Sequence, residues 1–153
     1  MLSYFHEIKS DKINNHIIIV DIDGTITNQG NFEIEQKVVN KIIDLKKTNS
    51  LYLCSNNKNK QRNLRIANRL SVPLINCNYK KPSKHILNSI LNIESSPILV
   101  IGDCFLTDIR FANKIQCGYI RTKRVISPFD SIFIRSFYLF DDLVFFFNRL
   151  IKK

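Results

Sequence analysis

The sequence predicts an α/β fold, a three-layer α/β/α sandwich built on a mainly parallel sheet, and two observations support this prediction. Short apolar runs alternate with amphipathic segments, and the run 17–20 contains only Ile and Val, as strands buried on both faces do. Strictly alternating strands and helices are typical of a parallel sheet with helices on both faces. The alternation extends from about residue 15 to residue 125.

The individual elements follow from apolar periodicity and from the residues that end helices. Pro73 and Pro97 each stand beside an expected strand, where proline ends the preceding helix. Ser83 precedes the apolar positions of a further helix, as an N-cap does. In chain order, strands are expected at 17–22, 51–55, 73–76, 98–102 and 117–121, alternating with helices at about 33–47, 58–70, 83–92 and 106–115.

Length and composition indicate a single domain over residues 1–153 that is kept in the cytoplasm. The chain has 153 residues, of which 44% are hydrophobic, enough for one sizeable core. Its apolar runs fall short of the ~20 residues that a spanning helix needs, and residues 1–12 are charged, unlike a signal peptide. The four cysteines lack CxxC spacing, so we expect reduced, structural thiols.

Positive charge is concentrated in the basic segment, residues 37–84. The net charge of the chain is +10, and this segment carries twelve Lys or Arg residues against one acid, Asp44. Such a segment attracts polyanions or an anionic membrane surface; the alternative is a coding bias that also enriches the chain in Asn and Ile. Nucleic acid is not expected as a partner, because the segment interleaves few aromatic residues and has no recognisable RNA-binding motif.

The tail, about residues 130–153, is expected to form a helix rich in phenylalanine. The favoured interpretation is that an apolar stripe on this helix packs against the body of the fold. The other is an interfacial helix that places phenylalanine among lipid headgroups, with its terminal lysines on anionic lipid. The stripe comprises Leu139, Leu143, Phe146, Phe147 and Leu150.

The most informative motif is a pair of carboxylates, Asp21 and Asp23, at the carboxyl end of the first expected strand. Two-residue spacing in extended backbone points both side chains to one face, at the edge where open α/β sheets place their chemistry. Gly24 and Thr25 then let the chain turn away. One carboxylate can act as nucleophile or metal ligand while the other transfers protons, although a strand ending in a solvated aspartate turn has a similar sequence.

Three further segments bring residues suited to phosphate chemistry to the same edge. Ser55 and Asn56 follow the second strand, where a hydroxyl and free backbone N–H groups can hold phosphoryl oxygens. Lys81 stands just before a helix, and its ammonium can neutralise charge on a transferred phosphoryl group. Asp103 and Asp108 follow the next long strand, and Asp103 together with the candidate nucleophile can build an oxygen-rich Mg²⁺ site.

These segments, DxDGT, SNN, KP and GDxxxTD in this order, resemble the four motifs of haloacid dehalogenase (HAD) superfamily phosphatases. Within that superfamily, the short spacings and the stretch GDCFLTDIRFANKIQCGYIRTKRV look most similar to the YqeG-type phosphatidylglycerophosphatase (PGP phosphatase) family. The resemblance covers about residues 15–125. It implies a HAD-like fold and an Mg²⁺-dependent phosphatase that works through an aspartyl-phosphate.

The resemblance also implies a role for each matching residue. Asp21 attacks phosphorus, and Asp23 protonates the leaving oxygen and later activates water. Asp108 orients a metal-bound water or the lysine. The expected phosphate-binding residues are Thr25, Ser55, Asn56 and Lys81, and the expected metal site comprises Asp21, the backbone carbonyl of Asp23, Asp103 and Asp108.

The spacing between the motifs leaves room for single β/α units and none for a cap domain. An uncapped site suits a bulky substrate, such as a lipid headgroup at a membrane or a macromolecule. The resemblance makes the first hypothesis the dephosphorylation of phosphatidylglycerophosphate (PGP), an anionic phospholipid, to phosphatidylglycerol at the cytoplasmic face of a membrane. The alternatives are a nucleic-acid terminal phosphate, a phosphoprotein or a sugar phosphate as substrate, and a non-catalytic adaptor, against which the complete set of motif residues argues.

Overall fold

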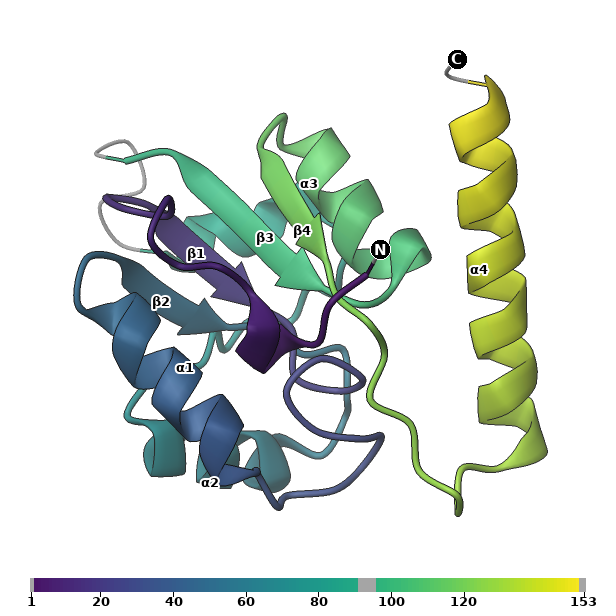
Figure 1. Ribbon diagram of the computed structural model, residues 1–153, viewed down its shortest axis with the longest axis horizontal. Helices are drawn as coiled ribbons and strands as arrows, with labels where there is room; N and C mark the ends of the chain where they lie inside the picture. The colour runs from purple at the N-terminus through teal and green to yellow at the C-terminus, as the bar shows by residue number, and fades with distance from the viewer. Residues whose placement is uncertain (1, 91–95, 152–153) are drawn as a thin grey trace.

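The computed structural model describes residues 2–90 and 96–151 and is organised around a four-stranded parallel sheet (Figure 1). The strands, in the spatial order β2-β1-β3-β4, are β1 (Ile17–Val20), β2 (Ser50–Leu53), β3 (Ile98–Gly102) and β4 (Gly118–Arg121). Because β1 pairs in parallel with both β2 and β3, Val20 lies between Leu53 and Ile101. The carboxyl ends of these strands therefore meet at one edge, which confirms the predicted α/β class.

Helices cover both faces of the sheet, because alternate strand residues point to opposite sides. On one face, Ile18 and Val20 of β1 pack with α1 and α2. On the other face, Ile17 and Ile19 pack with η2 and α3. The helical elements are η1 (Phe5–Glu7), α1 (Gln36–Lys46), α2 (Lys60–Leu70), η2 (Lys84–Ser89), η4 (Phe105–Ile109), α3 (Arg110–Lys114) and α4 (Ile132–Ile151).

Three expected elements differ from the structure in type or length. The strand expected at 73–76 is reduced to one bridge between Leu74 and Leu53 at the edge of the sheet, since Pro73 has no N–H to extend the pairing. The helix expected at 83–92 is the short 3₁₀-helix η2, and residues 91–95 lie outside the described part of the chain.

The helix expected at 106–115 begins as a π-helical turn, η4, before it continues as α3. The N–H groups of Asp108 and Ile109 both donate to the carbonyl of Cys104, at 2.9 and 3.3 Å. Such local widening is frequent at functional sites. Here it lies where the motif GDxxxTD leaves β3.

Helix α4 lies at one side of the molecule (Figure 1). The favoured interpretation, that the apolar stripe of the tail packs against the body of the fold, is wrong. Every residue of the predicted apolar stripe is exposed, from 48% for Leu143 to 64% for Leu139. The helix contacts η4 through its opposite side, where Asp141 is fully buried and the ring of Phe145 lies 5.6 Å from that of Phe105. The stripe does not pack on the domain, because the buried acid, and not the apolar side, faces the arginines of the body. Among the helices of the described ranges, none is both long enough and apolar enough to cross a membrane.

The four cysteines are free thiols, as expected. Burial raises the pKa of Cys54 and of Cys104 to about 12, so both thiols stay protonated at neutral pH. Cys54 belongs to the core between the sheet and α3. These thiols therefore fill space and take no part in the chemistry described below.

Candidate active site

The structure brings three of the predicted residues, Asp21, Lys81 and Asp108, into direct contact. Asp21 follows β1, and its N–H donates to the carbonyl of Ile101 in β3 at 2.9 Å, which holds it at the carboxyl edge of the sheet. Lys81 Nζ donates to Asp21 Oδ1 at 2.5 Å and to Asp108 Oδ1 at 2.6 Å. The exposed fraction of each side chain is at most 9%. A buried ammonium therefore lies between two buried carboxylates.

Lys81 is held in place by Asn56 and stays charged. The Asn56 side-chain amide donates to the Lys81 carbonyl at 2.9 Å and accepts from the Lys81 N–H at 2.8 Å. Burial by itself disfavours an ammonium, but the carboxylates of Asp108 and Asp21 together raise the pKa of Lys81 well above its ordinary value. The Asn56 side chain thus positions the lysine, a role that the sequence did not predict.

Thr25 and Arg124 hold Asp103 beside this group. Thr25 Oγ1 lies 3.2 Å from Asp21 Oδ2 and 3.2 Å from Asp103 Oδ1, and Arg124 Nε donates to Asp103 Oδ2 at 2.5 Å. Thr25 is fully buried, so its hydroxyl orients the two carboxylates. The sequence predicted that Thr25 binds phosphate and did not predict that it orients these carboxylates.

Asp21, Asp103 and Asp108 together have the geometry of a cation site. Each offers one carboxylate oxygen, and these oxygens lie within 4.8 Å of one another. Burial, with a contribution from the neighbouring carboxylates, raises the pKa of Asp103 to about 6 and that of Asp21 well above its ordinary value. The three carboxylates carry more charge than Lys81 and Arg124 neutralise, and Mg²⁺ prefers such oxygen ligands. The donor set therefore fits Mg²⁺ in its chemistry.

Two glycines let the chain approach the carboxylates closely. Gly24 has a φ of +83°, and a Cβ there would lie 2.7 Å from the Asp103 carboxylate. A Cβ at Gly102 would overlap the Asp108 carboxylate. Glycine is needed at position 24 because of the positive φ and because a side chain would clash with Asp103. At position 102 it is needed because a side chain would clash with Asp108.

Asp23 belongs to a second group, formed with Ser55 and Arg62. Ser55 Oγ donates to Asp23 Oδ2 at 3.1 Å, and Arg62 Nη1 donates to the same oxygen at 2.8 Å. The Arg62 guanidinium also donates to the Asn31 carbonyl, at 2.7 Å from Nε, and so ties α2 to the loop after β1. The structure thus places Ser55 beside the carboxylate that the sequence assigned to proton transfer.

Two residues of the basic segment, Arg62 and Lys81, do not belong to its exposed charge. Both are buried and paired with carboxylates, so neither contributes to an anion-attracting surface. Lys58, Lys60 and Lys80 are exposed and line a cavity of about 280 Å³ that adjoins the two groups described above. These lysines therefore place exposed positive charge beside the site.

Sequence reasoning missed Asp141, a tail residue that supports the carboxylate cluster. Asp141 is fully buried and accepts hydrogen bonds from two backbone N–H groups of η4, at 3.0 and 2.8 Å. It also pairs with Arg121 at 3.1 Å and with Arg124 at 2.9 Å. Because Arg124 binds Asp103 as well, the tail is linked to the cation site. The position of Asp141 on the side of α4 away from the apolar stripe was a signal available in the sequence.

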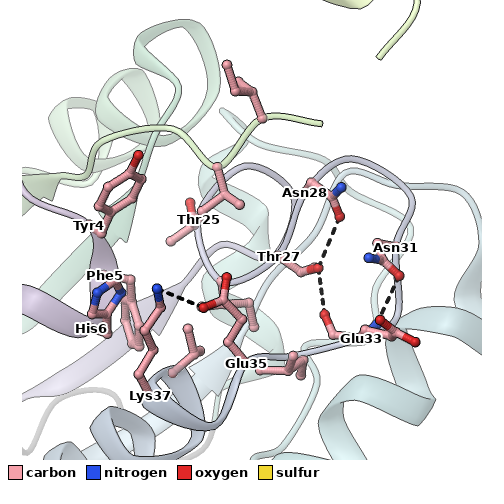
Figure 2. Close-up of a pocket in the computed structure, with 15 residues that line it drawn as sticks. Tyr4, Phe5, His6, Thr25, Thr27, Asn28, Asn31, Glu33, Glu35 and Lys37 are labelled. Atoms are coloured by element: carbon pink, nitrogen blue, oxygen red, sulfur yellow. Dashed lines mark hydrogen bonds and ion pairs between the residues drawn. The ribbon is translucent and has the colours of Figure 1, made fainter. Parts of the chain in front are cut away.

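A cavity of about 450 Å³ is lined by the carboxylates of Asp21, Asp23 and Asp103 together with the first turns of α4. Figure 2 shows a different cavity, of about 370 Å³, between the N-terminal segment and the start of α1. There Lys37 pairs with Glu35 at 2.7 Å, so these polar groups satisfy one another. The cavity lined by Asp21, Asp23 and Asp103 is the candidate active site.

Buried carboxylates around a buried lysine, at the carboxyl edge of a parallel α/β sheet, define the class of site that handles phosphoryl groups. Comparison with models of known protein families identifies the family, since the model described as mitochondrial PGP phosphatase matches residues 5–126. The chain therefore belongs to the PGP phosphatase family, which confirms the family expected from the motifs. Comparisons with curated proteins and with solved structures found no match. Helix α4 lies beyond the matched residues.

Proposed function

We propose that this chain is an Mg²⁺-dependent phosphomonoesterase of the HAD type that converts PGP to phosphatidylglycerol through an aspartyl-phosphate on Asp21. One observation carries the proposal: Asp21 lies against Lys81 at 2.5 Å in a buried cluster of carboxylates, in a chain of the PGP phosphatase family. Such a cluster supplies a nucleophile and a fixed positive charge at one point. Phosphoryl transfer depends mainly on these two things.

In the first step, a carboxylate oxygen of Asp21 forms a bond to phosphorus while the bond between phosphorus and the glycerol oxygen of the lipid breaks. Asp23 gives its proton to the departing oxygen, which leaves as the hydroxyl of phosphatidylglycerol. Arg62 and Ser55 fix the Asp23 carboxylate through hydrogen bonds at 2.8 and 3.1 Å. This fixed orientation favours proton transfer to one oxygen of the substrate.

In the second step, Asp23 takes a proton from water, and the water oxygen displaces Asp21 from phosphorus, so that inorganic phosphate leaves. Lys81 neutralises charge on the phosphoryl group in both steps. Its ammonium has three N–H donors, of which two bind Asp21 and Asp108; within residues 2–90 and 96–151 the third is left for a phosphoryl oxygen. Asn56 keeps this ammonium in place.

Asp21, Asp103 and Asp108 would hold Mg²⁺, with the backbone carbonyl of Asp23 as a further ligand. Bound there, Mg²⁺ supplies positive charge that stabilises the negative oxygens of the phosphoryl group. Arg124 and Thr25 orient the carboxylates that would bind it.

The charge around the site supports an anionic phospholipid as substrate and a peripheral contact with the membrane. Lys58, Lys60 and Lys80 line the cavity that adjoins the site, and the chain carries a net charge of +10. A surface of this kind draws an anionic headgroup and its bilayer toward the site. Nucleic acid is not proposed as a partner.

The test is phosphate release with Mg²⁺ from PGP in detergent micelles, compared with phosphorylated oligonucleotides, phosphopeptides and sugar phosphates. We expect PGP to be the best substrate and EDTA to abolish its hydrolysis. Asp21→Asn should lower kcat by about 10³-fold or more without changing the fold, whereas Asp11→Asn, at an exposed position, should change nothing. Preference for another substrate contradicts the lipid assignment, and turnover by a folded Asp21→Asn variant contradicts the nucleophile.

A further inference from the structure

Helix α4 turns a polar side toward the domain and an apolar side toward solvent, the reverse of an ordinary surface helix. Asp141 is fully buried on the inner side, and Tyr138 and Phe145 are half-buried there. Figure 1 shows α4 at the outer side of the molecule. On its solvent side, six large apolar residues are 48% to 64% exposed: Leu139, Phe140, Leu143, Phe146, Phe147 and Leu150. A continuous apolar surface of this kind marks an interaction site.

We propose that these six residues, here called the α4 lipid face, lie among the headgroups of an anionic bilayer and seat the active-site cavity on a lipid substrate. The proposal rests on the proposed function, because it takes a phospholipid as the substrate. A helix of 20 residues is about 30 Å long. With one apolar side only, such a helix lies in the plane of the membrane surface.

The α4 lipid face is continuous with the active-site cavity. Phe133, Phe137 and Tyr138, from the first turns of α4, line the same cavity of about 450 Å³ as Asp21 and Asp103. Phe133 is 83% exposed and Phe137 45% exposed, so apolar surface leads from the helix to the mouth of the cavity. A lipid whose phosphate reaches Asp21 would therefore have its apolar part beside α4.

Tyr138 also lines that cavity, but its hydroxyl is not exposed to solvent. It is buried and has no hydrogen-bond partner among residues 2–90 and 96–151. The cavity thus combines an apolar wall from α4 with the carboxylates of Asp21, Asp23 and Asp103, as a lipid with a polar headgroup requires.

Charge favours a bilayer over a second copy of this chain as the partner of α4. Two copies with a net charge of +10 each repel one another, whereas an anionic bilayer attracts them. Arg135 and Arg149 are exposed near the two ends of α4. Lys58 and Lys60 line the cavity that shares Asn56 with the active-site cavity, so exposed cations lie on α4 itself and beside the active-site cavity.

A single tryptophan tests where α4 lies. The chain has no tryptophan, so Phe147→Trp places one reporter on the α4 lipid face, and Ile43→Trp, at a 55% exposed position of α1, is the matched control. With phosphatidylcholine vesicles that contain about 30% phosphatidylglycerol, we expect brominated acyl chains to quench Phe147→Trp and not Ile43→Trp. Equal quenching of the two reporters, or none, overturns the proposal.

A matched pair of double variants tests the contribution of the same surface to binding and activity. Leu143→Gln with Phe147→Gln should weaken binding to these vesicles by roughly tenfold or more. Ile43→Gln with Tyr119→Gln, which also removes one exposed aliphatic and one exposed aromatic residue, should leave binding unchanged. For the α4 variant, the rate on PGP in vesicles should fall by a similar factor relative to the rate on a soluble phosphate ester. Wild-type binding by the α4 variant overturns the proposal.

Sedimentation and micelle assays separate the remaining outcomes. A stable dimer that the α4 variant dissociates, with no binding of the wild type to vesicles, identifies a second copy as the partner and overturns the lipid surface. Hydrolysis of PGP in micelles without vesicle binding also overturns this surface and keeps the proposed function. Vesicle binding through α4 without hydrolysis of any lipid phosphate supports the surface and overturns the proposed function.

Discussion

Asp141→Ala removes the buried carboxylate through which α4 is attached to the domain. Its oxygens accept hydrogen bonds from two N–H groups of η4, at 3.0 and 2.8 Å, and from Arg121 and Arg124, at 3.1 and 2.9 Å. The substitution leaves these donors without this acceptor. Because Arg124 also orients Asp103, the change should reach the cation site.

The expected loss of stability follows from what remains after the substitution. Removing one partner of a buried ion pair costs about 3–5 kcal/mol. Arg124 keeps Asp103 at 2.5 Å, and Arg121 keeps the exposed Asp142 at 2.5 Å, so we expect the low end, about 3 kcal/mol. For a chain of this size, that lowers the melting temperature by about 6–12 °C.

Thermal unfolding followed by circular dichroism measures this loss of stability. A Mg²⁺ titration of phosphatase activity measures whether the substitution also weakens Mg²⁺ binding. We expect the Mg²⁺ concentration for half-maximal activity to rise about tenfold in Asp141→Ala, since the orienting partner of a metal ligand is weakened. Asp142→Ala is the matched control: Asp142 is 56% exposed and its loss should cost about 1 kcal/mol or less. An unchanged melting temperature and Mg²⁺ dependence in Asp141→Ala would refute this account of α4.

Three other predictions test the site. Arg62→Ala should lower kcat about 10- to 100-fold with little change in KM, because the acid–base carboxylate loses its orienting partner at 2.8 Å; exposed Arg65→Ala is the control, and equal rates for the two variants would contradict this role. Gly102→Ala should destabilise the fold by about 2 kcal/mol or more, since the added Cβ overlaps the Asp108 carboxylate. If the variant melts like the wild type, the Asp108 carboxylate can move to make room for the methyl group, which contradicts this prediction. In EDTA, the melting temperature should fall as the pH rises from about 4 to about 6. The pKa of Asp103 is raised to about 6, so in this range the folded protein binds a proton that the unfolded chain has released. This difference in pKa between the folded and unfolded states corresponds to a loss of about 3 kcal/mol in the free energy of unfolding. Mg²⁺ should reduce this loss, and a melting temperature that rises with pH over the range would contradict the sign.

The order of strands and helices and the residues of the carboxylate cluster could be predicted from the sequence, because both depend on local patterns. Ile17 to Val20 is an unbroken apolar run, and a parallel sheet brings the ends of its strands to one edge whatever the loops do. Asp21 and Asp103 follow such strands directly, so their proximity needed no knowledge of side-chain packing. The π-helical turn η4 and the loss of the strand at 73–76 depend on hydrogen bonds that local periodicity does not encode.

The roles of Arg62, Asn56 and Asp141 were decided only by the tertiary structure, because each binds a residue far away in the chain. Arg62 reaches Asp23 from α2, and Asp141 reaches Arg124 from α4; in the sequence, both look like ordinary charges of a basic segment and of a tail. By itself the sequence determined the fold class, the residues of the carboxylate cluster and the apolar stripe of α4. Which side of α4 meets the domain was decided by burial: a carboxylate paired with two arginines and two N–H groups is held inside, and this attachment turns the phenylalanines toward solvent.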